Sequence, residues 1–247
     1  MRPLKTAIHE QQKAGGKIRE NWLALLASVY FSMEDFQAMR DILYQLVTIN
    51  PKEQYLVNLA AIHGQLGETD KQLALIETLK DDKRLRSEQH LLNLANLFMV
   101  HELPFKAASL LEEEMAAGRI TANKRNLQLQ SQAWYLAGNY DKALAPLQKA
   151  AETTGEGDLW LRLARLHVSL YDWPGAEKFA RKAVQSENLK NPGDGLILLG
   201  TALARQNKFN AAKKIFRRAR QHEGSEKWAR QWLNFVDSEQ QRLAALQ

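Results

Sequence analysis

The chain has 247 residues, of which 45% are hydrophobic and 25% charged, and its formal net charge is +6. This is the composition of an ordered globular protein and not of a disordered or fibrous one. The absence of cysteine excludes disulfide frameworks, zinc-thiolate sites and cysteine nucleophiles. Since no apolar run reaches the roughly 18 residues that span a bilayer, and residues 1–16 lack the apolar core of a signal peptide, we expect no membrane insertion.

The first 19 residues predict a single helix. Leu4, Ala7 and Ile8 fall on one helical face, and Gly15-Gly16 ends the pattern. This matches the second helix of a hairpin whose first helix is missing. We therefore expect residues 1–19 to be a partial upstream repeat helix, and the chain to be the C-terminal part of a longer array.

From residue 20 onward one pattern recurs six times. It consists of a leucine or tryptophan, another large residue three positions later, and a small residue immediately after that. The first members lie 33, 35, 36, 33 and 36 residues apart, which is the period of stacked helical hairpins. The triplets are Leu23/Leu26/Ala27, Leu56/Leu59/Ala60, Leu91/Leu94/Ala95, Leu127/Gln130/Ser131, Trp160/Leu163/Ala164 and Leu196/Leu199/Gly200.

Each period predicts two antiparallel helices joined by a short turn. In the last repeat, one helical stripe ends near Leu203, and a second stripe runs from Ala212 to Ala219. Small residues such as Gly200 and Ala212 are required where the two helices approach each other closely. After the last repeat, residues 227–247 predict a capping helix with Trp228, Trp232, Phe235 and Val236 at helical spacing.

These features resemble the tetratricopeptide repeat. The resemblance is carried by the small residues, by turns such as Gly138-Asn139-Tyr140 and Tyr171-Asp172-Trp173, and by Pro51 at the end of the first repeat. It covers residues 20–226 as six repeats and implies an all-α, right-handed superhelical solenoid closed by the capping helix. It also implies a protein-binding scaffold without catalytic activity, cofactor or metal.

In this family the first helices line an inner groove, so the resemblance implies a peptide-binding surface on their unburied face. Side-chain amides pair with the N–H and C=O groups of an extended peptide, and two arginines one turn apart suit a carboxylate. Apolar Leu92, Met99, Leu161 and Val168 lie between the polar positions. The expected peptide-binding residues are Asn58, Asn93, Asn96, Gln128, Gln132, Tyr135, Arg162 and Arg165. The alternative is that these residues only solvate the groove.

Two branches of the family differ in their partners. One binds the terminal carboxylate of heat-shock chaperones through lysines, but Ala24, Val57 and Leu92 stand where those lysines are expected. The other comprises repeat proteins found with TonB-type systems of Gram-negative bacteria, which the runs Asn21 to Asn50 and Leu103 to Ala108 resemble. That resemblance implies a periplasmic scaffold acting with TonB, ExbB and ExbD; without it the expected compartment is the cytoplasm.

Two other functions remain open. Lys213, Lys214, Arg217, Arg218 and Arg220 alternate with apolar positions, so all five are expected on the outer face, where nucleic-acid phosphates would bind. No aromatic is interleaved there to stack bases, which argues against this alternative. The second is a regulator of lipid-II or peptidoglycan processing in the envelope.

Histidines offer the main candidates for chemistry besides carboxylates. His63 and His167 occupy the repeat position filled elsewhere by Tyr30, Phe98 and Trp134, and no two histidines have the i, i+4 spacing of a helical metal site. Packing between first helices therefore explains them, and we expect no catalytic or metal-binding residue.

Overall fold

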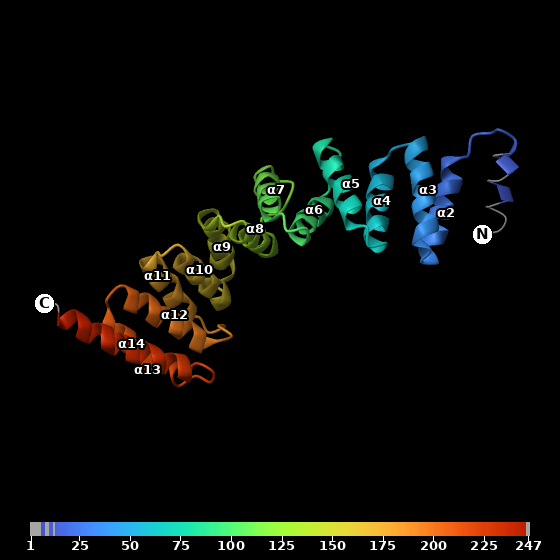
Figure 1. The fold of residues 1–247 in the computed structure, drawn as a ribbon. Helices are drawn as coiled ribbons and strands as arrows, with labels where there is room; N and C mark the ends of the chain where they lie inside the picture. Colours follow the sequence, from blue (N-terminus) through green and yellow to red (C-terminus); the bar gives the residue numbers. More distant parts are fainter. Residues whose placement is uncertain (1–5, 8–9, 12, 246–247) are drawn as a thin grey trace. The chain divides into compact units, whose positions relative to one another are not determined.

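The computed structural model describes residues 6, 7, 10, 11 and 13–245. These residues form helices, labelled α2 to α14 in Figure 1, and include no strand. The prediction of an all-α helical-repeat fold is confirmed. Two compact units make up the chain: unit 1 comprises Met1–Glu102 and Ala116–Ile120, and unit 2 comprises Leu103–Met115 and Thr121–Gln247.

Leu4 and Ile8, on which the expected upstream helix depends, lie outside the described residues. In the part of the chain that the structure describes, no helix has the length and apolar character needed to cross a membrane.

Unit 1 is built from consecutive antiparallel hairpins. Leu23, Leu46 and Leu59 are almost completely buried in its core, because the helical period places them on one face of each helix. The helices are α2 (Glu20–Ser32), α3 (Phe36–Ile49), α4 (Glu53–Gln65), α5 (Thr69–Asp81) and α6 (Glu88–Val100).

Unit 2 continues the same pattern, each helix packing on the next from α8 onward. Its buried face includes Trp134, Leu163 and Phe216. The helices are α7 (Pro104–Ala116), α8 (Lys124–Leu136), α9 (Tyr140–Thr154), α10 (Gly157–Ser169), α11 (Trp173–Gln185), α12 (Pro192–Arg205), α13 (Phe209–Ala219) and α14 (Glu226–Ala244).

The turn between the two helices of each repeat contains one residue in the left-handed backbone region. These six residues have φ between +56° and +77°, and they repeat at the same intervals as the helical triplets: Glu34, Gly67, Glu102, Gly138, Tyr171 and Asn207. Glycine and asparagine accept this conformation readily, which explains Gly67, Gly138 and Asn207. The two glutamates and the tyrosine adopt it although their side chains disfavour it, so the requirement comes from the hairpin and not from the local residue.

Small residues lie where the two helices of a hairpin meet. Gly200 of α12 faces the ring of Phe216 on α13, which is completely buried. In the fourth repeat the equivalent residue is Ser131, whose hydroxyl donates to the carbonyl of Ala143 on α9 at 2.8 Å. The small side chain thus brings the two helix backbones close enough for a direct hydrogen bond between the helices.

The two histidines singled out by the sequence bind turn carboxylates. His63 Nδ1 lies 2.5 Å from Glu68, and His167 Nδ1 lies 2.7 Å from Asp172. Both acids precede the first residue of a second helix. His63 also contacts the Tyr44 hydroxyl at 3.0 Å. Packing between first helices is therefore only part of the role of these histidines. His63 contacts Tyr44 and His167 contacts Phe179, both on second helices, and each ring also binds a residue of the turn.

Helix α14 packs on α13 through the stacked rings of Trp232 and Phe216, 5.6 Å apart. Val236 is completely buried, whereas Trp228 and Phe235 are exposed. Lys213, which the sequence placed on the outer face with four other basic residues, is instead directed at α14. It forms an ion pair with Asp237 and donates to Gln240 at 2.8 Å. The expectation is therefore wrong for Lys213, because α14 packs beside it, whereas Lys214, Arg217, Arg218 and Arg220 are exposed as expected.

We expect the first repeat to lose stability in acid through Glu20. Lys52, Tyr55 and Asn50 donate to its carboxylate and hold its pKa at about 2, below the ordinary 4.5. Because the folded pKa is the lower one, this stabilisation is present above pH 4.5 and is lost as the pH falls toward about 2.

Hydrogen-exchange protection of α2 and α4 measures the effect. It should fall across that pH window in the wild-type chain and change less in Glu20→Gln, which should already be less protected at neutral pH. Equal acid losses in the two chains would contradict the role of Glu20.

Candidate functional site

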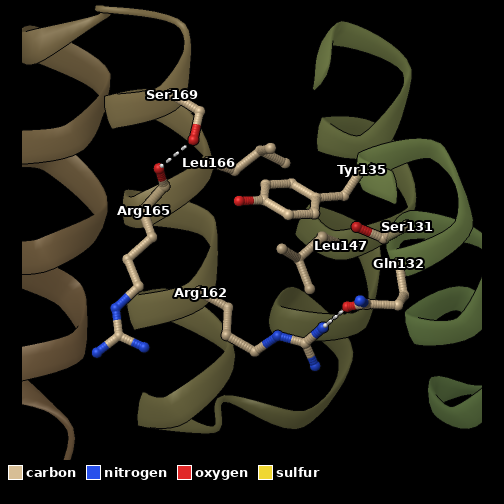
Figure 2. A pocket seen from close by; sticks show the side chains of 8 residues that line it. All are labelled: Ser131, Gln132, Tyr135, Leu147, Arg162, Arg165, Leu166 and Ser169. Atoms are coloured by element: carbon tan, nitrogen blue, oxygen red, sulfur yellow. Dashed lines mark hydrogen bonds between the residues drawn. The ribbon is translucent and has the colours of Figure 1, made fainter. Parts of the chain in front are cut away.

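A pocket of about 210 Å³ opens between the first helices of the fourth and fifth repeats, within unit 2. Figure 2 shows its side chains, with α8 and α10 on either side and Leu147 of α9 between them. Helix α8 supplies Ser131, Gln132 and Tyr135, and α10 supplies Arg162, Arg165, Leu166 and Ser169.

The helical period decides which side chains reach this pocket. On α8, Leu127 and Trp134 are buried in the core, which leaves Gln132 and Tyr135 on the open face. On α10, Trp160 and Leu163 turn inward in the same way. The pocket therefore lies between two neighbouring first helices.

Arg162 is the half-buried cation of the pocket. Its guanidinium donates to Gln132 Oε1 at 3.2 Å, and among the described residues no carboxylate forms an ion pair with it. Burial lowers the pKa of the Arg162 guanidinium, and the positive charge of Arg165 lowers it further. A partly desolvated charge without an opposite charge is unfavourable, so this guanidinium would gain from an incoming anion.

Arg165 is engaged elsewhere. Its side chain is 55% exposed, and its guanidinium lies 3.4 Å from the Asp194 carboxylate on α12. In Figure 2 it points away from Tyr135, whereas Arg162 points toward Gln132. The two arginines, which the sequence suggested as a joint carboxylate site, thus point in different directions.

Tyr135 completes the polar part of the site. Its ring lies 5.3 Å from that of Tyr140, is 43% exposed, and directs its hydroxyl into the pocket in Figure 2. The hydroxyls of Ser131 and Ser169 donate to the carbonyls of Ala143 and Arg165 instead. Donors that remain for a ligand therefore come mainly from Arg162, Tyr135 and the Gln132 amide.

The structure places half of the expected residues elsewhere. Asn58, Asn93 and Asn96 lie in unit 1, and Gln128 is not among the residues that line the pocket. The three asparagines already make hydrogen bonds within their own helices, to Gln54, Gln89 and the Leu92 carbonyl respectively. Leu161, expected on the groove face, is only 5% exposed.

Sequence reasoning missed four lining residues: Ser131, Leu147, Leu166 and Ser169. Ser131 was noted only as the small residue at the helix contact. Leu147 belongs to a second helix, whereas the family resemblance implies ligand contacts on first helices alone. Its spacing of four from Ala143, one turn along the inward face of α9, is the signal that identifies it.

The net positive charge of the chain comes from unit 2. That unit contains 21 lysines and arginines against 15 aspartates and glutamates, a formal charge of +6, whereas unit 1 contains 13 of each. Lys214, Arg217, Arg218 and Arg220 contribute an exposed basic face on the last repeat. An acidic partner is therefore attracted to the unit that holds the Arg162 pocket.

Comparison with known proteins identifies the repeat. Residues 23–53 match the tetratricopeptide repeat family. No curated protein gave a significant sequence match. Among solved structures, YrrB, described as a tetratricopeptide-repeat protein with an unusual peptide-binding site, has a TM-score of 0.56 at 16% identity, over 76% of this chain and 95% of its own.

Two other solved structures are similar to a comparable degree. The MamA protein has a TM-score of 0.54 at 20% identity, covering 68% of this chain and 90% of its own. The C-terminal part of a repeat-containing protein from Cytophaga hutchinsonii has a TM-score of 0.54 at 15% identity, covering 79% and 77%. At such identities the likeness concerns the fold.

Proposed function

We propose that this chain, which is a tetratricopeptide-repeat protein, is a non-catalytic scaffold that binds a segment of another protein in the pocket between α8 and α10. The observation that carries the proposal is the half-buried Arg162 guanidinium, which has no carboxylate partner among the described residues. A ligand carboxylate supplies the missing charge through a charge-assisted hydrogen bond.

The other pocket residues suit an extended peptide. The Tyr135 hydroxyl and the Gln132 amide offer a donor and an acceptor to peptide N–H and C=O groups. Leu147 and Leu166 provide apolar contact for the aliphatic part of a glutamate or aspartate side chain. The net charge of unit 2 accelerates the encounter with an acidic segment.

Comparison with other proteins supports the class of partner. YrrB has the same fold and is described as having a peptide-binding site, which is why we favour a peptide over nucleic acid. None of the three similar structures is described as part of a TonB system. TonB, ExbB and ExbD are therefore not named as partners in this proposal.

Selection from a random peptide library on the full chain tests the function. We expect the enriched peptides to contain aspartate or glutamate, and we expect a synthetic copy to protect residues 131–135 and 162–169 from hydrogen exchange. Enriched peptides that leave these residues unprotected and protect 213–220 on α13 would contradict the proposal and place binding on the basic outer face.

A further inference from the structure

A second pocket, in unit 1, occupies the same place in the repeat as the first. It lies between α2 and α4, and seven of its lining residues precede lining residues of the Arg162 pocket by 104 positions. The floor residue is leucine in both, Leu43 and Leu147. Other lining residues differ: Ser28 stands for Gln132, Phe31 for Tyr135, Asn58 for Arg162 and Ala61 for Arg165.

These replacements make the unit 1 pocket larger and apolar. Its volume is about 360 Å³, against about 210 Å³ for the Arg162 pocket. Leu43 and Leu46 line the inner wall, and Phe31 at the rim remains 58% exposed. An apolar ligand group that fills this pocket would remove these apolar walls from water, which is favourable.

Most of the polar groups of this pocket are already paired. The Tyr55 hydroxyl donates to Glu20 at 2.7 Å, and the Ser28 hydroxyl donates to the Leu25 carbonyl at 2.8 Å. Asn58 Oδ1 accepts from Gln54 at 2.9 Å, while Asn58 Nδ2 donates to no atom of the described residues. The pocket therefore offers apolar walls and one amide donor at its rim.

Charge distinguishes between the possible occupants. Among the described residues, none that lines the unit 1 pocket is charged, and the sequence of unit 1 as a whole has equal numbers of acidic and basic residues. The carboxylate of a fatty acid or the phosphate of a lipid headgroup therefore finds no counter-charge there. A neutral peptide segment does fit, since a backbone carbonyl accepts the hydrogen bond that Asn58 Nδ2 offers.

We propose that the unit 1 pocket is a second recognition site, which binds a bulky apolar side chain, leucine or phenylalanine, of a peptide segment. Asn58 Nδ2 donates to the backbone carbonyl beside that side chain, and Phe31 covers it from the rim. The proposal rests on unit 1 alone and does not require the acidic-peptide site of unit 2.

Small amide probes test this site on the full-length chain by NMR. N-acetyl-leucinamide should shift the backbone amides of residues 24–31 and 58–62 with a Kd in the millimolar range, which is usual for about a dozen non-hydrogen atoms. N-acetyl-alaninamide lacks three carbons of apolar surface and should bind at least about tenfold more weakly. N-acetyl-glutamate amide should leave these residues unshifted.

Matched variants locate the binding. Asn58→Arg combined with Ala61→Arg gives this pocket the two arginines of unit 2, and it should abolish the response to the leucine probe. Gln45→Arg adds a charge to an exposed position of α3 outside the pocket and should retain that response. Arg162→Gln should retain it as well, which separates this site from the one in unit 2.

Three results would overturn the proposal. The leucine and alanine probes could bind equally, the double variant could keep the leucine response, or octanoate could bind the same residues more tightly than leucinamide and reveal a lipid site. The comparison of leucine, alanine and octanoate uses the wild-type chain, so it remains decisive even if the double variant does not fold.

Discussion

Gly200→Ala is expected to destabilise unit 2 by about 1 to 2 kcal/mol. A methyl group on Gly200 would lie 2.5 Å from Phe216 Cε1. The Phe216 ring is fully buried and stacked on Trp232, so it has no free space to move into. Overpacking of this kind costs about 1 to 3 kcal/mol, which exceeds the gain of up to about 1 kcal/mol from the helix propensity of alanine.

Gly64→Ala is the matched control for this prediction. A methyl group there would lie 2.5 Å from the Gln72 side-chain oxygen, but that amide is the end of a flexible, partly exposed side chain and can move away. We expect its effect to stay within about 0.5 kcal/mol. The midpoints of urea unfolding of the two variants and the wild type are compared by circular dichroism, and for Gly200→Ala also by tryptophan fluorescence. If Gly200→Ala unfolds at the same urea concentration as the wild type, α12 and α13 are not in close contact at this position.

The repeat was predictable because its signal is redundant. Six triplets at intervals of 33 to 36 residues report the same hairpin, so an irregular member such as Gln130 does not hide the period. The conformation of the turns was harder to predict. Glu34 and Tyr171 adopt the left-handed conformation that glycine adopts in other repeats, although neither residue type favours it.

The site was harder to predict than the fold, because side-chain direction is a tertiary property. The sequence places Arg162 and Arg165 one turn apart on an open helical face. It does not show that Asp194 of the next repeat engages Arg165, or that Gln132 of the preceding repeat engages Arg162. Lys213 was misplaced for the same reason, since its partner Asp237 belongs to a different helix.

The two pockets show that equivalent positions in the repeat can have different surroundings. Asn58 and Arg162 are 104 residues apart and hold the same place in their repeats, so the period alone aligns them. The period does not show that the residues around Asn58 and around Arg162 differ in polarity. Ala61 and Phe31 make the first pocket apolar, whereas Arg162 and Tyr135 make the second polar.

Arg162→Gln is expected to weaken binding of an acidic peptide by roughly 10- to 100-fold. A hydrogen bond to a charged group contributes about 1.5 to 3 kcal/mol, and a half-buried guanidinium is weakly screened by solvent. Arg165→Gln should cost less than about threefold, because that side chain is exposed and already paired with Asp194. Isothermal titration with a glutamate-containing peptide from the library selection measures both constants.

Arg217→Gln removes the same charge from the exposed face of α13 and serves as the control for long-range attraction. Its effect on affinity should be small and should vanish as salt is added. The stability of Arg162→Gln should equal or exceed that of the wild type, because the substitution removes a partly desolvated charge. If Arg162→Gln binds like the wild type while Arg217→Gln loses the peptide, the ligand is held by the outer basic face and the pocket between α8 and α10 is not its site.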